Sequence, residues 1–458
     1  MSHTRHVSAS IHPTETVGGR FKRIILCCDG RWKDGFEPWL ATSILRLSRI
    51  INHEDKRHHH TISQIVYYQS GIGGHDNSIY SKILQATIGS LASLAENIQE
   101  GYGFISQNYV PGDEIFLFGY SRGAYTARMI ASLIGVIGVM DRQDMDHFPH
   151  LFIDLLKRGK SRDKAEIFEL DARLARWTAR DSLGNRRAHY DKDTFSVKFV
   201  GLFDTVGNFG LPVELTGSPE MTRLFGFSDL WLGEHIEYAI HALAINETRA
   251  DWKPTKYEQT EGGRRKKQVL NQCWFAGCNN DVGGGYEDHD LSDVTLTWMI
   301  AHVGPFLSMD HKYMLSLLRP CYPWGEQPHH NPRTGFYELS ETIVRRLPTS
   351  TDDVTHETLH SSVFRIPPHL KASIKSNHVI VAKLLHFEED IRKQWPYVHG
   401  RYPPRDHKTE DRPDSHKLLA NMAIHKRAEL THQAIHDIAQ KETRRSWKTP
   451  DGEWTGRK

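Results

Sequence analysis

The sequence contains no long hydrophobic run. Its longest apolar stretch, residues 131–140, is broken by Gly135 and Gly138, whereas a membrane-spanning helix needs about 20 consecutive, mostly apolar residues. The first 19 residues are polar and rich in Ser, Thr and His, and they lack the apolar region of a secretory signal peptide. We therefore expect a chain without a transmembrane segment or a signal peptide.

Cysteine is scarce and the net charge is small. The five cysteines, at positions 27, 28, 273, 278 and 321, leave one over from any pairing and form no disulfide framework. Three of them fall within apolar runs, where a free cysteine behaves as a small hydrophobic residue. A reducing cytoplasm is the simplest setting for such a chain. The formal net charge of +2 gives no general attraction to nucleic acid.

What the sequence does contain is a series of short apolar runs separated by helical patterns. The runs are continuous rather than alternating, as is typical of parallel strands that helices cover on both faces. Between the second and third runs, apolar residues recur at spacings of three and four from Ile88 to Ile105 and predict an amphipathic helix. This alternation predicts an α/β fold with a mostly parallel, doubly wound sheet and helical insertions. The five predicted strands are residues 23–29, 63–69, 114–119, 197–204 and 269–277.

One large domain accounts for most of the 458 residues. Residues 205–260 separate the fourth and fifth predicted strands with helical pieces, such as residues 234–250. A loop rich in Pro and His, residues 321–333, follows the core motifs, and the end of the chain is strongly charged. We therefore expect a flexible segment (1–20), a large α/β domain with insertions (21–400, core motifs 23–305) and a charged extension (401–458), helical at 415–441 and disordered at 442–458.

The sharpest motif is Gly119-Tyr-Ser121-Arg-Gly123, which ends the third predicted strand and directly precedes a helical pattern. A serine hydroxyl is a useful nucleophile only when it is exposed, fixed and paired with a base. A sharp strand-to-helix turn exposes and fixes the serine, and small residues on both sides relieve the crowding. The context therefore predicts that Ser121 is the nucleophile of an α/β-hydrolase, with a packed structural turn as the alternative.

The remaining parts of such a site are expected at the carboxyl ends of neighbouring strands. The backbone N–H of Arg122, at the start of the helix, is one expected oxyanion donor, and the loop of Gly30 and Arg31 after the first strand is the candidate for the second. For that loop, a plain strand-end turn is the alternative. Asp204 ends the fourth strand and follows Ser121 in chain order, as the acid of an α/β-hydrolase does. We therefore expect Asp204 to be the acid, with a turn or cap residue as the alternative.

The sequence offers little support for a metal or cofactor site. Three glycines at residues 283–285 form a shaped loop, but they lack the following Lys-Ser/Thr of a phosphate-binding loop. His58, His59 and His60 are adjacent and cannot all face one ion. We expect no metal and no cofactor. The basic run at residues 263–267 is a candidate for contact with anionic lipid headgroups, and an exposed turn tip is the commoner alternative.

Together these motifs resemble the α/β-hydrolase domain called domain of unknown function 2235, a family that includes type VI secretion phospholipase effectors. The resemblance spans roughly residues 20–370, and the order and number of its segments make it more specific than the serine motif alone. It implies a Ser–Asp–His triad, with Ser121 as the nucleophile, Asp204 as the acid and a lipid or phospholipid ester as the substrate. The matching segments are residues 28–32, 109–128, 203–207, 241–249, 274–286 and 360–363.

The histidine of the triad is where this chain departs from the family. Members of the family read Gly-x-His-x-Asp-Val-Gly-Gly-Gly after the fifth strand, and this chain has Asn279 in the histidine position. The opening Asp-Gly-Thr of the family also reads Asp29-Gly-Arg31 here. Asparagine does not accept and return a proton near neutral pH. Loss of one triad member lowers turnover by roughly four to six powers of ten.

Three interpretations of Asn279 are open. The chain is an inactive or very slow relative that still binds its ligand; or another histidine, His289 or His360, serves as the base; or the asparagine is an introduced replacement. We predict a protein of the serine hydrolase type that acts on carboxylic esters. The alternative is a catalytically impaired pseudoenzyme that serves as a ligand-binding or regulatory module.

Overall fold

The computed structural model describes residues 21–30, 41–71, 92–189, 195–206, 230–250, 252–333, 341–365 and 379–402. The chain divides into one compact unit, Met1–Pro403, and a second unit, Pro404–Lys458. The predicted flexible segment (1–20), the predicted helix at 415–441 and the predicted disordered tail at 442–458 all lie outside the described residues.

A nine-stranded sheet forms the centre of the first unit, in the order β11-β10-β9-β7-β5-β4-β1-β3-β2. Neighbouring strands run parallel, except that the short β2 is antiparallel to β3. A two-stranded sheet pairs β6 with β8. The strands are β1 (Arg23–Cys28), β2 (Glu54–Asp55), β3 (Ile62–Gln69), β4 (Glu114–Tyr120), β5 (Val197–Phe203), β6 (Trp231–Leu232), β7 (Ile236–Ala244), β8 (Glu258–Gln259), β9 (Val269–Phe275), β10 (Glu357–His360) and β11 (Val381–Ala382).

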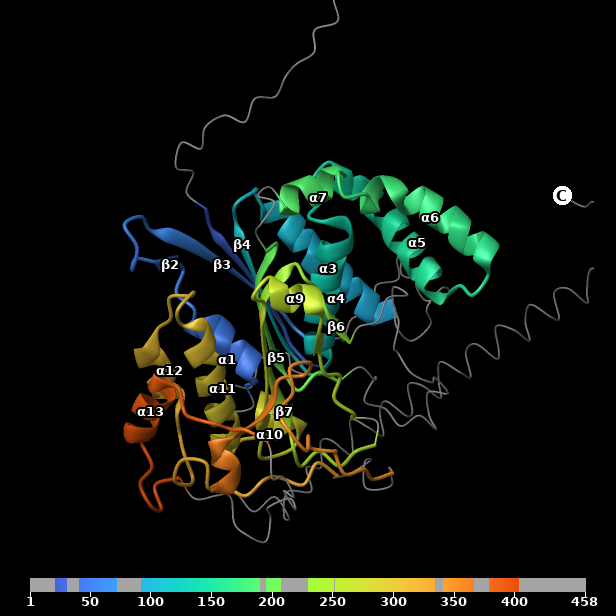
Figure 1. The fold of residues 1–458 in the computed structure, drawn as a ribbon. Helices are drawn as coiled ribbons and strands as arrows, with labels where there is room; N and C mark the ends of the chain where they lie inside the picture. Colours follow the sequence, from blue (N-terminus) through green and yellow to red (C-terminus); the bar gives the residue numbers. More distant parts are fainter. Residues whose placement is uncertain are drawn as a thin grey trace, which may run out of the picture. The chain divides into compact units, whose positions relative to one another are not determined.

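Helices cover both faces of the central sheet (Figure 1). On one face lie α3 (Ala92–Asn108), α4 (Arg122–Ile137) and α5 (Phe148–Lys160), and on the other lie α1 (Ser43–Ile50), α11 (Asp290–Val303) and α12 (His311–Leu317). The fold is therefore the predicted α/β-hydrolase-like class, with a mostly parallel, doubly wound sheet. The other helices of the described residues are α6 (Lys164–Thr178), α7 (Leu183–Ala188), α9 (Glu261–Arg265), α10 (Asn279–Gly283) and α13 (His386–Lys393), with 3₁₀ turns at Asp144–His147 and Ser361–Phe364.

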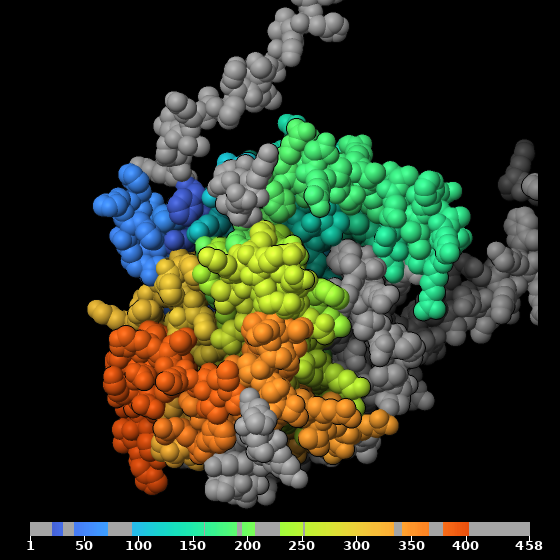
Figure 2. Space-filling model, in the orientation of Figure 1, coloured from blue at the N-terminus to red at the C-terminus, as the bar shows by residue number. Residues whose placement is uncertain are grey.

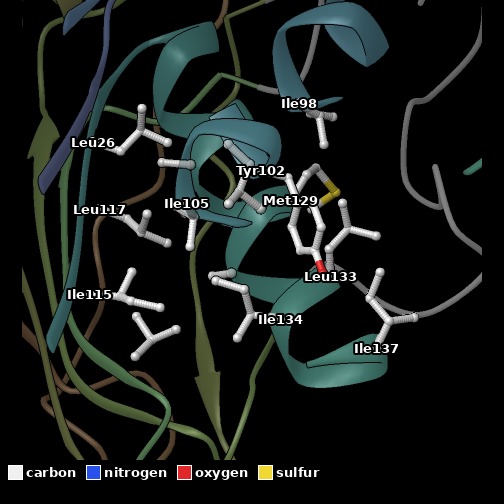
Figure 3. Close-up of a cluster of buried hydrophobic side chains, with 14 of the residues drawn as sticks. Leu26, Ile98, Tyr102, Ile105, Ile115, Leu117, Met129, Leu133, Ile134 and Ile137 are labelled. Carbon is white, nitrogen blue, oxygen red and sulfur yellow. The ribbon is translucent and has the colours of Figure 1, made fainter. Parts of the chain in front are cut away.

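The strand β1 shows how one apolar run serves two hydrophobic cores. Ile24 and Leu26 point to one face and join the core with α3 and α4, whereas Ile25 and Cys27 point to the other and join the core with α1 and α11. Successive side chains of a strand alternate between faces, so a strand buried on both sides must be apolar throughout. Figure 3 shows the first of these cores, where side chains of α3 and α4 pack over β1 and β4.

The five predicted strands are all confirmed, within one or two residues at their ends, as β1, β3, β4, β5 and β9. The predicted amphipathic helix is confirmed in its described part, because α3 buries Ala95, Ile98, Tyr102 and Ile105 on one side. The helix predicted at residues 234–250 is wrong. That segment contains β7, which pairs with β5 on one side and β9 on the other in the middle of the sheet.

The last described segments extend the sheet and lie against the part of the chain before β9. The strand β10 pairs with β9, residue Thr342 forms a β-bridge with Arg249, and the Gln259 N–H donates to the Val354 carbonyl at 2.8 Å. Figure 2 shows the orange residues of 341–365 lying next to the yellow-green residues before β9. A residue late in the sequence can therefore reach the carboxyl ends of the central strands.

All five cysteines carry free thiols, and four of them are buried. Among the described helices, none combines the length and the apolar character that crossing a membrane requires.

Candidate active site

Ser121 joins β4 to α4 in a strained turn. Its backbone has φ 55° and ψ −115°, a conformation that residues other than glycine rarely adopt. The flanking glycines have no room for a side chain. A Cβ on Gly119 would lie 2.4 Å from the Ala124 Cα, and a Cβ on Gly123 would lie 2.2 Å from the Cys28 carbonyl oxygen. The motif therefore has the strand–turn–helix geometry that holds a serine at the edge of a sheet.

The turn lies at the point where the strand order reverses. From β1 the chain continues to β3 on one side and then to β4 on the other, and ligands of open α/β sheets bind at the carboxyl ends of the strands at such a point. The Ser121 N–H donates to the Phe203 carbonyl at 2.9 Å, and the Val206 N–H donates to the Ser121 carbonyl at 3.2 Å. Ser121 is thereby fixed beside the end of β5.

The two expected oxyanion elements both lie next to Ser121. Arg122 is the first residue of α4, and N–H groups in the first turn of a helix point out of its end. A Cβ on Gly30 would lie 3.5 Å from the Ser121 Cβ, so the loop after β1 does reach the serine. In this structure the Gly30 N–H donates to the Asp29 carboxylate at 2.6 Å, and Arg31 lies outside the described residues.

Asp204 follows β5 directly and is fully buried, with an unusual φ of 41°. Each carboxylate oxygen accepts two hydrogen bonds. Oδ1 accepts the Ala244 N–H at 3.0 Å and one guanidinium nitrogen of Arg345 at 2.5 Å. Oδ2 accepts the Asn279 amide at 2.7 Å and the other guanidinium nitrogen at 3.0 Å. The four lone-pair positions of the carboxylate are thus all occupied.

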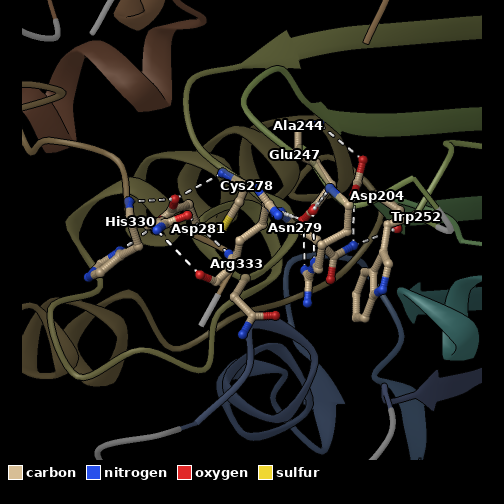
Figure 4. Close-up of polar contacts among 12 residues, drawn as sticks. Asp204, Ala244, Glu247, Trp252, Cys278, Asn279, Asp281, His330 and Arg333 are labelled. Atoms are coloured by element: carbon tan, nitrogen blue, oxygen red, sulfur yellow. Dashed lines mark hydrogen bonds and ion pairs between the residues drawn. The ribbon is translucent and has the colours of Figure 1, made fainter. Parts of the chain in front are cut away.

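Asn279 begins α10 and contacts Asp204, as its place in the motif implies (Figure 4). Its Nδ2 donates to the Asp204 Oδ2 and also to the Asp204 carbonyl at 3.1 Å. A carboxylate only accepts, so the amide must turn its NH2 toward Asp204 and its Oδ1 away. That Oδ1 is buried and has no hydrogen-bond partner among the described residues, and the Asn279 backbone N–H donates to Glu247 at 3.2 Å.

The two histidines considered as replacement bases each have another partner. His289 Nδ1 lies 2.8 Å from Asp293 at the start of α11, and Asp293 also pairs with Arg46. His360 Nε2 lies 2.9 Å from Glu388. Within the described part of the chain, no hydrogen bond or ion pair joins either histidine to Ser121 or Asp204.

A third histidine, which the sequence reasoning did not single out for a role, lies beneath Asp204. His241 in β7 is fully buried, and its Nε2 accepts the Thr205 N–H at 3.1 Å while Nδ1 contacts the Gln272 side chain at 3.3 Å. Burial and the nearby positive charge of Arg128 lower the pKa of His241 to about 3. A neutral imidazole therefore holds the backbone that follows Asp204.

On the far side of α10, a His–Asp pair joins the helix to the loop at 321–333. His330 Nδ1 lies 2.5 Å from Asp281 Oδ1, and Asp281 Oδ2 accepts the Cys278 N–H at 2.9 Å. The His330 ring also stacks on Tyr286. Burial lowers the pKa of His330, but the hydrogen bond to Asp281 and the negative charges of Asp281, Asp288 and Asp290 together outweigh burial, so the pKa is raised overall. Figure 4 shows this pair on the opposite side of Asn279 from Asp204.

Two arginines near the site were also missed by sequence reasoning. Arg345 binds Asp204 and lies 141 residues further along the chain, with no motif around it. Arg249 binds Glu247 through two nitrogens at 2.7 and 2.8 Å and stacks over Trp252. Glu247 and Arg249 lie in the segment 241–249, which resembles the family, and that resemblance is the available sequence signal for them.

The basic run at 263–267 lies at the other edge of the sheet. It immediately precedes β9, and the neighbouring Gln268 side chain donates to the Ile236 carbonyl at 2.8 Å, at the start of β7. These are the amino ends of parallel strands, whereas Ser121 follows the carboxyl end of β4. Over the described residues, no group of three or more His, Cys, Asp or Glu side chains is placed to hold a metal ion.

Comparison with known proteins supports the family resemblance. The model of the family described as "T6SS, Phospholipase effector Tle1-like, catalytic domain" matches residues 22–302. The chain is 27% identical over 249 residues to "Uncharacterized protein YEL023C" of Saccharomyces cerevisiae, covering 51% of this chain and 32% of that protein. The resemblance predicted from the motifs is confirmed.

Two solved structures are also similar. One is "Structure of the Tle1 effector bound to the VgrG spike from the Type 6 secretion system", with 17% identity, a TM-score of 0.29, and 58% of this chain and 52% of that chain covered. The other is "Crystal structure of an uncharacterized protein from Pseudomonas aeruginosa", with 16% identity, a TM-score of 0.31, and coverage of 62% and 45%. The chain thus spans about a third of the yeast protein and about half of each solved chain.

Proposed function

The chain belongs to the family of type VI secretion phospholipase effector Tle1-like catalytic domains, and we propose that it acts on carboxylic esters of lipids through Ser121. In this proposal Ser121 attacks the ester carbonyl, Asp204 is the acid, and the Arg122 N–H with the loop of Gly30 and Arg31 stabilises the oxyanion. The support is a serine with positive φ between a strand and a helix, at the switch point of a parallel sheet, with a buried carboxylate one strand away. The lipid as substrate class rests on the family.

One contact carries the proposal about rate. The Asn279 amide donates to the Asp204 carboxylate at 2.7 Å, in the position where a triad histidine would donate. This contact keeps the acid hydrogen-bonded but supplies no base for the serine proton. We therefore propose slow turnover, lower by roughly four to six powers of ten than with a complete triad, sustained by the oxyanion donors and substrate binding.

A second candidate function is a ligand-binding module that performs no hydrolysis. The observation that favours it is the saturation of Asp204, whose four lone-pair positions are filled by Ala244, Asn279 and Arg345. Such a carboxylate is stable without a histidine. In this alternative the site around Ser121 still binds an ester, and binding of the ester rather than its hydrolysis is the function.

The experiment that separates these candidates is labelling with a fluorophosphonate probe, combined with turnover of short-chain and phospholipid esters. The proteins to compare are the unmodified chain, Ser121→Ala and Asn279→His. If the chain is a slow hydrolase, labelling of the unmodified chain is slow and disappears in Ser121→Ala. Restoring a base by Asn279→His raises both labelling and turnover.

A matched control is Asn280→His, which adds a histidine one residue away. Asn280 accepts the Tyr120 hydroxyl at 2.7 Å and does not contact Asp204 in the structure, so this variant is expected to show no gain. Absence of Ser121-dependent labelling and of ester turnover, in both the unmodified chain and Asn279→His, would sink the hydrolase proposal. Ester binding without turnover would then favour the ligand-binding module.

A separate experiment tests whether His289 or His360 serves as the base. His289→Gln and His360→Gln are made in the unmodified chain and labelled under the same conditions. Because each histidine is engaged by Asp293 or Glu388, we expect the slow Ser121 labelling to persist. Its loss in one folded variant would identify that histidine as the base.

We also propose a reducing, cytoplasmic setting, supported by five free thiols of which four are buried.

Lipid contact through residues 263–267 would leave Ser121 at the opposite edge of the sheet. We propose that the substrate approaches the carboxyl ends of the strands instead, where Ser121 and Asp204 lie. Ester turnover on vesicles by a variant with Arg264, Arg265 and Lys267 changed to Gln tests this proposal. We expect turnover to be undiminished in this variant.

A further inference from the structure

We propose that Arg345 is a positioning residue that balances the charge of Asp204 in this chain and thereby limits how far a base at position 279 can restore activity. This inference rests on the proposed function of Ser121 and Asp204. It predicts that the site departs from a working triad at two positions, 279 and 345, rather than at one. Position 345 lies outside residues 22–302, the segment that matches the family.

The geometry of Arg345 is that of a rigid clamp. Two guanidinium nitrogens bind the two oxygens of Asp204 at 2.5 and 3.0 Å, and the same nitrogens donate to the Ala244 carbonyl at 2.8 Å and the Trp252 carbonyl at 2.5 Å. The side chain of Arg345 is 1% exposed. Water therefore screens this ion pair little, and the planar guanidinium has a single arrangement that makes all four contacts.

The charges around position 279 come in closed pairs. Asp204 faces the Asn279 side chain and is paired with Arg345, and Glu247 faces the Asn279 backbone and is paired with Arg249. On the other side of α10, Asp281 is paired with His330. The two carboxylates that Asn279 contacts, Asp204 and Glu247, therefore each have an arginine partner already. A neutral amide suits this environment.

A histidine base has the opposite requirement. When the imidazole takes the serine proton it becomes a cation, and the triad acid stabilises that cation. The guanidinium of Arg345 is bound to the same carboxylate and opposes the new positive charge. Two unit charges a few ångströms apart in a protein interact strongly enough to change a rate by roughly 10- to 100-fold or more. Arg345 is thus expected to suppress much of the rate increase that Asn279→His would otherwise produce.

The test uses the full chain carrying Asn279→His as the background. In this background Arg345→Gln removes the charge and keeps a donor, Arg345→Met is a second neutral variant, and Arg345→Lys keeps the charge without the fork. Arg23→Gln is the matched control, because Arg23 is also buried and binds a buried carboxylate, Asp55, but lies at the amino end of β1, whereas Asn279 follows the carboxyl end of β9. Circular dichroism verifies that each variant is folded.

The readouts are Ser121 labelling, ester turnover over a range of pH, and the pKa of the introduced imidazole by NMR. The neutral Arg345 variants are expected to raise labelling and turnover by roughly 10- to 100-fold over Asn279→His alone. They are also expected to raise the pKa of the introduced imidazole by roughly one unit. Arg345→Lys and Arg23→Gln are expected to produce neither change.

Two outcomes would overturn the inference. One is an imidazole pKa that stays the same when Arg345 is made neutral, and the other is Ser121-dependent activity that is measurable and equal in the Gln and Lys variants. If the pKa rises as expected but no variant labels at Ser121, the inference stands and the proposed hydrolase function fails. The two failures are therefore distinguishable.

Discussion

Replacing Gly123 with alanine is expected to disrupt the turn that holds Ser121, because the added methyl group has nowhere to go. It would meet the Cys28 carbonyl oxygen at 2.2 Å and the Asp29 carbonyl oxygen at 2.4 Å. Both atoms belong to the backbone at the end of β1, in the centre of the sheet, so no side chain can rotate away. Either α4 or the end of β1 must move by about 1 Å to restore ordinary contact distances.

The expected magnitude follows from overpacking. Forcing an extra methyl group into a well-packed region destabilises a protein by roughly 1–3 kcal/mol, and rigid backbone neighbours favour the upper end. Gly103→Ala is the matched control, since the nearest atom to its added methyl group is the Met145 Cε at 3.8 Å, an ordinary contact. Gly103 lies inside α3, where alanine is preferred to glycine by roughly 0.5–1 kcal/mol.

Urea unfolding of the two variants measures this difference directly. We expect the free energy of unfolding to fall for Gly123→Ala and to rise for Gly103→Ala. Ser121 labelling is expected to fall in the first variant and to be retained in the second, because only the first displaces the loop after β1. The same sign of stability change in both variants would refute the packing argument, and full labelling in a destabilised Gly123→Ala would refute its link to the site.

Two further predictions concern stability. Burial, reinforced by the negative charge of Asp293, raises the pKa of Asp290 to about 7 from an ordinary 3.8. The protonated carboxyl group therefore stabilises the folded state fully below pH 3.8, and this stabilisation is lost as the pH rises through about 7. Urea unfolding is measured at pH 5.5 and pH 8. Between these two pH values the free energy of unfolding is expected to fall by roughly 2 kcal/mol more in the unmodified chain than in Asp290→Asn, and equal falls would contradict this. Tyr102→Phe removes a buried hydroxyl that donates to the Gly138 carbonyl at 2.9 Å and accepts the Met140 N–H at 3.0 Å; it is expected to lower the free energy of unfolding by roughly 1–3 kcal/mol, and a neutral change would argue against these bonds.

Much of the fold could be predicted because continuous apolar runs are a strong signal for strands buried on both faces. The segment containing β7 was misassigned because its pattern is ambiguous. Ile236, Ala239, Ile240 and Leu243 recur at spacings of three and four, as in a helix, yet the same residues form a central strand between β5 and β9. For a short apolar run, position in the sheet decides the outcome, and periodicity alone does not.

The contact between Asp204 and Asn279 could be anticipated because both residues follow strands of one parallel sheet, whose carboxyl ends meet at one edge. Arg345 could not be anticipated in the same way. It reaches Asp204 from a segment that lies between α12 and β10 and belongs to no matching motif. Nothing local in the sequence specifies that approach, which depends on how the late segments pack against the residues before β9.

The most direct test of the account is the rate at which a fluorophosphonate modifies Ser121 in the unmodified chain, in Ser121→Ala and in Asn279→His. The account predicts slow labelling of the unmodified chain, none in Ser121→Ala, and faster labelling in Asn279→His. Rapid labelling of the unmodified chain that Asn279→His does not increase would contradict it, because Asn279 would then not be the residue that limits the serine.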